Sequence, residues 1–196
     1  MRVHYSRIAA LILGAWICGS LFMAFVATQN FERAKEVLSA PPPEVERIIQ
    51  TVGSENSRLF LRHLVGEQNR SFFSSWELAQ FAIGALLTGV LFIDANNRKL
   101  AAFSAAMLLM TAFAHFIMTP ELIWLGRGIE FAPAGAMLRE RDQFSKLHIM
   151  YGVMEAVKVL LGVVLAGLLF TMRRQHGRQK DQIDLFDVTP TQSYKS

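Results

Sequence analysis

Charged residues and cysteine are both scarce in this chain. Only 18% of its 196 residues are charged and 52% are hydrophobic, whereas about a quarter of a typical soluble domain is charged. The single cysteine, Cys18, excludes an intramolecular disulfide and any cysteine-rich metal site. No phosphate-binding glycine loop, zinc-protease motif or nucleophile elbow is present. We therefore expect neither an enzyme nor a resident cofactor or metal.

The hydrophobic residues are gathered in four blocks. A helix that crosses a bilayer needs about 20 predominantly apolar residues. The sequence therefore predicts an all-α integral membrane four-helix bundle, with spans at about residues 8–28, 76–93, 100–118 and 149–172. The third span should end at Thr119 and Pro120, because proline commonly stops a helix. Residues 1–172 would form the membrane domain, and residues 173–196 a disordered cytoplasmic tail.

The first and fourth blocks need further argument. Arg2 and Arg7 precede the first block in the manner of a signal peptide, but cleaved signals have shorter apolar regions, so a retained span is favoured. The uncharged part of the fourth block is too short to cross a bilayer alone. This span must therefore include Glu155 and Lys158.

The basic residues indicate topology rather than a nucleic-acid partner. The net charge is +4, and short basic segments flank the spans at both termini and at Arg98 and Lys99. This pattern favours cytoplasmic termini, although further basic residues on the other side blur it. We expect a multi-pass protein of the cell membrane, in a bacterium the inner membrane, whose main partner is the lipid bilayer.

The outer connection, residues 29–75, should be helical and cap the bundle between the first two spans. Proline and acidic residues favour a helix start near Pro43, and Gly53 separates it from a second amphipathic segment. Helices lying in the lipid interface are the alternative. Glu67, Asn69 and Arg70 precede the second span, where they either anchor the cap or form a solvated surface.

Several ionisable residues should meet in the outer third of the membrane. On the fourth span, His148, Tyr151, Glu155 and Lys158 are spaced three or four residues apart, which places them on one helical face. Charges at this depth should face the bundle, one another or water. We therefore predict a polar pocket beneath the outer connection, which consists of Glu77, Gln80, His115, His148, Tyr151, Glu155 and Lys158.

Two simpler interpretations compete with this pocket. Glu155 and Lys158 could form a structural pair within one helix, with the lysine reaching out to the interface. His115 and His148 could ligate a metal or haem, but two histidines without a spaced motif are weak support for ligation.

The segments GEQNRSFFSSWELAQ (66–80) and FSKLHIMYGVMEAVK (144–158) resemble a family of four-span membrane proteins. This family includes the transmembrane protein 205-like proteins and bacterial relatives with a domain of unknown function. The resemblance implies the same four-span architecture and supplies no catalytic residues.

Two functions remain open from the sequence. The first is a non-enzymatic accessory or scaffold subunit, whose partners would be other membrane proteins or further copies of the chain. The alternative is a transporter or binding protein for a small solute or lipid. No proline or paired glycines interrupt a span in the manner of many transport sites, which favours the first.

Overall fold

The computed structural model describes residues 2–93, 98–133 and 135–187, and for residues 2–4 and 172–187 it describes the backbone alone. The chain forms α1 (Arg2–Ser39), α2 (Pro43–Val52), α3 (Ser54–Ile93), α4 (Arg98–Phe113), the π-helix η2 (Ala114–Met118), α5 (Thr119–Glu130) and α6 (Leu138–Asp187). Its described part contains no strand. The predicted all-α fold is therefore confirmed.

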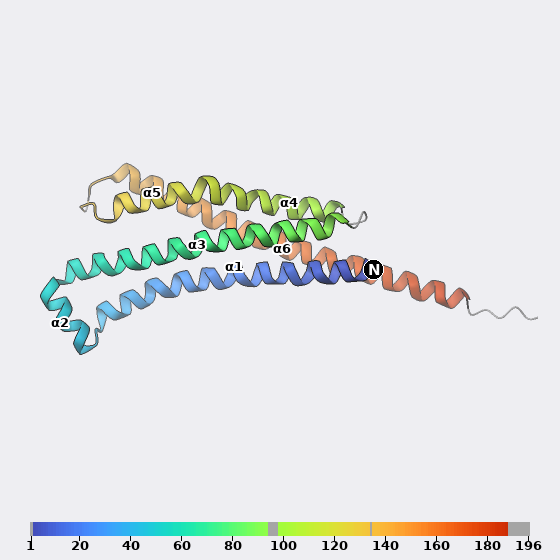
Figure 1. Ribbon diagram of the computed structural model, residues 1–196, viewed down its shortest axis with the longest axis horizontal. Coiled ribbons are helices and arrows are strands. Elements are labelled where there is room, and N and C mark those ends of the chain that lie inside the picture. The colour runs from blue at the N-terminus through green and yellow to red at the C-terminus, as the bar shows by residue number, and fades with distance from the viewer. Residues whose placement is uncertain (1, 94–97, 134, 188–196) are drawn as a thin grey trace, which may run out of the picture.

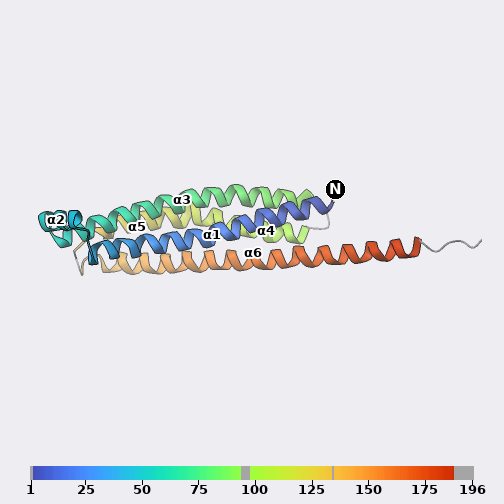
Figure 2. The ribbon, with the colours of Figure 1, turned by 90° about the horizontal axis from the view of Figure 1, so that it is seen from below.

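Four long helices lie side by side and alternate in direction (Figures 1 and 2). α1 packs on α3 and α6, and α4 packs on the same two helices, so the bundle is closed. We call the end at which α2 lies the connector end, and the opposite end, where the N-terminus lies, the terminal end (Figure 1). Each long helix, with α4, η2 and α5 counted as one, is long and apolar enough to cross a membrane.

Large apolar side chains project from the outside of the bundle. Leu11, Phe92 and Leu109 are each more than 70% exposed, at positions inside the predicted spans. A soluble protein rarely leaves so much apolar surface in water, whereas lipid tails solvate it. The chain is therefore a multi-pass membrane protein that contacts the bilayer.

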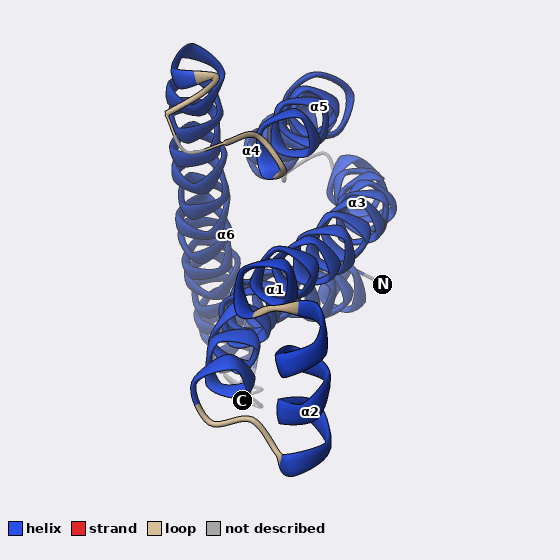
Figure 3. Ribbon diagram, turned by 90° about the vertical axis from the view of Figure 1, so that its left-hand side faces the viewer, coloured by secondary structure: helices blue, strands red, loops and turns tan. Residues whose placement is uncertain are grey.

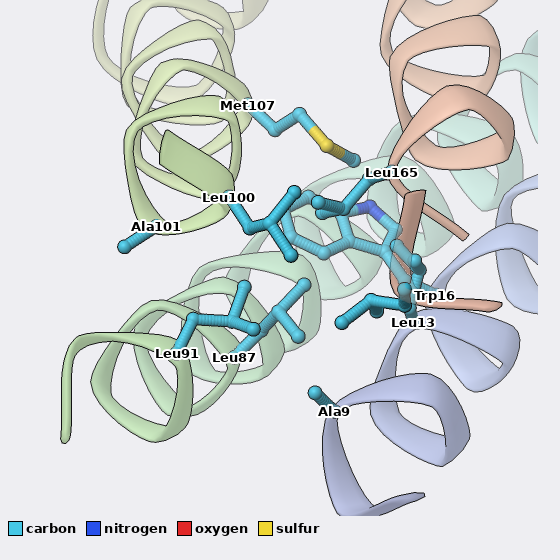
Figure 4. Close-up of a cluster of buried hydrophobic side chains, with 10 residues drawn as sticks. Ala9, Leu13, Trp16, Leu87, Leu91, Leu100, Ala101, Met107 and Leu165 are labelled. Atoms are coloured by element: carbon cyan, nitrogen blue, oxygen red, sulfur yellow. The ribbon is translucent and has the colours of Figure 1, made fainter. Parts of the chain in front are cut away.

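The core of the terminal half is apolar. It consists of Ala9, Leu13, Trp16, Leu87, Leu91, Leu100, Ala101, Met107, Leu165 and Leu169, most of which Figure 4 shows converging from all four long helices.

α1 and α3 each pack a tryptophan ring against a glycine of the other helix. A Cβ added at Gly19 of α1 would lie 2.1 Å from the ring of Trp76, and one added at Gly84 of α3 would lie 2.9 Å from the ring of Trp16. Each glycine therefore makes the space that the other helix's indole fills, which permits close helix packing.

The outer connection is helical, as predicted, but its short helix α2 does not reach the predicted pocket. α1 continues to Ser39, and three prolines follow soon after it. α2 then starts at Pro43 and ends at Val52, and the next residue, Gly53, has a φ of 91° that favours glycine. α2 has no buried residue and lies at the tip of the connector end (Figures 1 and 3). The 22 residues of α3 before Trp76 extend about 33 Å, which places α2 too far from the apolar zone for an interfacial helix.

Two predicted boundaries need correction. The third span does not end at Thr119 and Pro120, because the π-turn of η2 carries the helix into α5, where Pro120 occupies the first turn. The N–H groups of the first helical turn have no partner within the helix, so proline, which lacks an N–H, is tolerated there. α6 continues to Asp187, in contrast to the predicted disorder from residue 173. Residues 173–187 contain no proline and are rich in helix-favouring arginine and glutamine, and residues 188–196 lie outside the described ranges.

Candidate functional site

A fully buried carboxylate lies where α3, η2, α5 and α6 meet. Glu77 Oε1 accepts hydrogen bonds from Tyr151 OH at 2.8 Å and from Thr119 Oγ1 at 2.5 Å. His115 Nδ1 lies 3.0 Å from Glu77 Oε2. We call these four residues the Glu77 cluster. A buried carboxylate needs such partners, because a charge in an apolar medium is otherwise very costly.

The π-helix positions two members of this cluster. In η2 the Thr119 N–H reaches back to the carbonyl of Ala114, five residues earlier. The extra residue in this turn changes the helical register between α4 and α5. As a result His115 and Thr119, four residues apart, both reach Glu77. π-turns of this kind are frequent at functional sites.

A buried lysine forms a second cluster nearer the terminal end. Lys158 is 1% exposed, and its Nζ donates to Gln80 Oε1 at 2.7 Å and to Thr111 Oγ1 at 3.3 Å. Glu155 Oε1 lies 2.6 Å from the same Nζ as an ion pair. Trp16 Nε1 also donates to Gln80 Oε1, at 3.2 Å. We call these five residues the Lys158 cluster. The predicted pair of Glu155 and Lys158 within one helix is therefore present, but its lysine is buried and does not extend to the interface.

A cavity of about 810 Å³ lies beside both clusters. α1 (residues 20–32) and α6 (residues 144–159) form two of its walls, and α3 and α5 form the others. We call it the α1–α6 cavity. Its lining is largely apolar, it is partly open to the surroundings, and Tyr151, Thr119 and Glu155 bring the two clusters to its surface. No residue of α2 lines it, but other parts of the outer connection do, namely Phe31, Glu32, Gly66, Asn69, Arg70 and Phe73.

Charged residues join α3 to α5 outside the predicted spans. Glu67 accepts two hydrogen bonds from Arg127, each 2.8 Å long, and two from Arg70. Arg70 also donates to Glu130, which lies 2.9 Å from His63 Nδ1. We call these five residues the α3–α5 network. The hydrogen bonds from Arg127 and the adjacent Arg70 lower the pKa of Glu67 to about 2, against the opposing effect of burial.

Two glycines leave room for this network. A Cβ at Gly66 would lie 3.1 Å from Glu130 Oε1, and one at Gly126 would lie 3.3 Å from a guanidinium nitrogen of Arg70. Asn69 faces the other way and bonds Asn30 and the Ala27 carbonyl of α1. Glu67, Asn69 and Arg70 therefore hold the first part of α3, which belongs to the outer connection, against α5 and α1.

The structure brings six of the seven predicted pocket residues into the two clusters. The exception is His148, which is exposed, stacks on Phe144 with ring centroids 5.8 Å apart, and lines the cavity. Sequence reasoning missed three buried members, Trp16, Thr111 and Thr119. Their only signal was a polar group within an apolar run, which Ser and Thr in membrane helices often provide without function.

The arrangement offers a volume in which a molecule could bind. The described residues contain no group of three or more His, Cys, Asp or Glu placed to hold a metal ion. Glu77 and Lys158 are occupied by fixed partners, whereas the cavity leaves a large apolar volume beside polar groups. Such a volume suits a molecule that is apolar along most of its length and polar at one part.

Comparison of the chain with protein-family models, with curated proteins and with solved structures found no match. The resemblance to the transmembrane protein 205-like proteins therefore stays a prediction, and the function must be argued from the site itself.

Proposed function

We propose that this chain is a non-enzymatic membrane protein that binds one amphipathic, lipid-like molecule in the α1–α6 cavity. The observation that carries the proposal is the position of this cavity. It extends from Ser20 and Val159, inside predicted spans, to Glu32 and Gly66, beyond the span ends. A ligand there would have apolar walls along most of its length and polar groups, among them Glu155 and Tyr151, beside one part of it.

The size and lining of the cavity support this proposal. Its volume of about 810 Å³ lies in the range of small-molecule sites, roughly 300–1,000 Å³. Small side chains, among them Ala24, Ala27, Gly152 and Ala156, widen it along α1 and α6. The accessory-subunit hypothesis stays a prediction. It would compete with ligand binding if a helix of a partner protein lay in the same cavity.

We further propose that both termini face the cytoplasm of a bacterial cell membrane. Arg2, Arg7, Arg98 and Lys99 all lie at helix starts on the terminal end (Figure 1). Basic residues close to span ends favour the cytoplasmic side. The connector end, with the mouth of the cavity, would then face outward.

Binding can be measured by fluorescence quenching in lipid nanodiscs. Trp76 lines the cavity, Trp16 is buried in the bundle, and Trp124 is exposed. In a Trp124→Phe background, single-chain amphiphiles with a bromine at the tail end should quench Trp76 in a saturable manner. Gly152→Phe should weaken this binding by about tenfold or more, since a phenyl ring there fills the cavity.

Gly167→Phe is the matched control. Both glycines lie on α6, and a Cβ added at either meets nothing within 4 Å, but only Gly152 lines the cavity. Quenching that rises linearly with the amphiphile content of the nanodisc, and equally in both variants, would show simple partition into lipid and overturn the proposal.

A further inference from the structure

We infer that the ligand of the α1–α6 cavity carries a positively charged head, a quaternary ammonium or an amine, on an alkyl tail. This inference rests on the proposed function and adds the chemistry of the head group. It follows from the order in which charged atoms are arranged around the cavity, and from the aromatic rings beside them.

The Glu155–Lys158 pair presents its negative side to the cavity. Glu155 lines the cavity and its side chain is 21% exposed, whereas the side chain of Lys158 is 1% exposed. The ammonium group is turned into the bundle, where Gln80 and Thr111 accept from it. A ligand in the cavity therefore meets the carboxylate first, with the compensating cation behind it.

The positive charge that lines the cavity is already neutralised. Arg70 donates to both Glu67 and Glu130, which lie on its far side in the α3–α5 network. The remaining charged lining residue is Glu32, which pairs with Lys35 as an exposed ion pair that solvent screens. An anionic head would therefore gain little from Arg70 and be repelled by Glu155.

Aromatic rings also line the cavity. Phe73, Trp76, Phe144 and Tyr151 all line the cavity, and Phe73 meets Tyr151 edge to face at 6.1 Å. The faces of aromatic rings attract cations, and quaternary ammonium ligands are held by such rings together with a nearby carboxylate. The combination of Glu155 with these four rings favours a cationic head over a neutral one.

The test compares heads on a constant tail. Trp124→Phe protein in nanodiscs is titrated with 12-bromododecyl-trimethylammonium, 12-bromododecanol and 12-bromododecanoate at about pH 8, above the usual titration range of imidazole. The ammonium compound should bind about tenfold more tightly than the alcohol, and more tightly still than the carboxylate. Tetramethylammonium, added as a competitor, reports whether the head binds without a tail.

Charge variants then locate the preference. Glu155→Gln should reduce the preference for the ammonium head to a few-fold, because it removes the carboxylate that faces the cavity. If this variant does not fold, the double variant Glu155→Gln/Lys158→Met removes both charges together and should lose the preference in the same way. Glu121→Gln is the matched control, since Glu121 lies on α5 and bonds Gln143 but does not line the cavity.

The outcomes separate the two proposals. Saturable binding of all three amphiphiles with equal affinity, or tightest binding of the carboxylate, would overturn the cationic head and leave the proposed function standing. Full displacement by millimolar tetramethylammonium would replace the amphiphile by a free organic cation. The absence of saturable binding by any probe would overturn both proposals.

Discussion

At the scale of single residues, Lys158 is a charged side chain buried inside the membrane bundle, where a charge is energetically costly. Its ammonium group is buried at membrane depth and has three oxygen neighbours, those of Gln80, Thr111 and Glu155. An ammonium group has three N–H donors, so this number of acceptors matches its capacity. One of the three partners, Glu155, also carries the compensating charge. Removing either charge alone leaves the other without its counter-charge.

We therefore expect Lys158→Met to lower the free energy of unfolding by roughly 3–5 kcal/mol, as is usual when one member of a buried pair is removed. Glu155→Gln should cost less, because Lys158 keeps Gln80 and Thr111. The double variant should be more stable than the sum of the two single effects predicts, with a coupling of about 1 kcal/mol or more. Thermal unfolding in a mild detergent measures this.

The exposed pair Asp142 and Lys146 on the same helix provides the control. Its single and double neutralisations should change stability by less than about 1 kcal/mol and be additive. Additive losses at Glu155 and Lys158 as well would mean that the two buried side chains do not stabilise each other.

The sequence predicts well those members of the two clusters that lie on α6. Spacing alone placed Tyr151, Glu155 and Lys158 on one face, and the cost of a charge in lipid turned that face inward. It could not choose their partners, because the rotation of α3 and α4 about their axes depends on packing such as that of Trp16 on Gly84. His148 has the right spacing but lies beyond the apolar zone, where an exposed ring carries little cost.

At the scale of helices, the α3–α5 network joins α3 to α5 by hydrogen bonds and ion pairs between charged side chains. These helix segments lie outside the predicted spans, so their contact must be stable in water. Glu67 is central, because both Arg70 and Arg127 donate to it and the two lie on different helices. The depressed pKa of Glu67 means that its charged form stabilises the folded state.

The sign of the pH effect follows from this depression. With a pKa of about 2 in the folded state and an ordinary value of 4.5 in the unfolded chain, the contribution of Glu67 is complete above about pH 5. It is lost as the pH falls from there to about 2. Melting temperatures measured between pH 7 and pH 3 should therefore fall, and Glu67→Gln should remove part of the fall by lowering the value at pH 7.

Glu55→Gln is the matched control on the same helix. Glu55 forms an ion pair with Arg58 that also lowers its pKa, but the pair lies within one helix and is exposed. Its loss should leave the pH profile nearly unchanged. A profile that is identical in Glu67→Gln and the unsubstituted protein would show that the network does not hold α5 on α3.

The continuation of the third span into α5 was not predictable from the pattern at Thr119 and Pro120. A proline commonly ends a helix, but here Pro120 lies in the first turn of α5 directly after the π-turn, so the helix continues. The connector that follows is likewise held by a long-range interaction. Arg141 donates to the carbonyls of Ile129, Ala132 and Ala136, which closes the end of α5.

At the scale of the whole molecule, the cavity arises because α1 and α6 touch only over part of their length. They meet near the terminal end, where Gly162 lies against Ile17. Toward the connector end they form opposite walls of the cavity. Hydropathy predicts four spans, because an apolar helix satisfies its backbone hydrogen bonds within itself and can therefore cross the bilayer. Successive spans then alternate in direction. It does not predict where two spans diverge.

The topology leads to a final prediction, about which side of the membrane each end faces. With Cys18 replaced by serine, single cysteines at Ser54 and Ala136 should share one side, since the start of α3 and the α5–α6 connection both lie at the connector end (Figure 1). A cysteine at Ser193 should lie on the other side, because four spans return the chain to its starting side. A membrane-impermeant maleimide applied to intact cells should therefore label Ser54→Cys and Ala136→Cys, and label Ser193→Cys only after permeabilisation. The reverse pattern would keep the four spans and invert the proposed orientation. Three of the four spans separate residue 54 from residue 193. Equal labelling of Ser54→Cys and Ser193→Cys in intact cells would therefore be incompatible with the four-span arrangement, and would require one of these three helices to lie outside the bilayer.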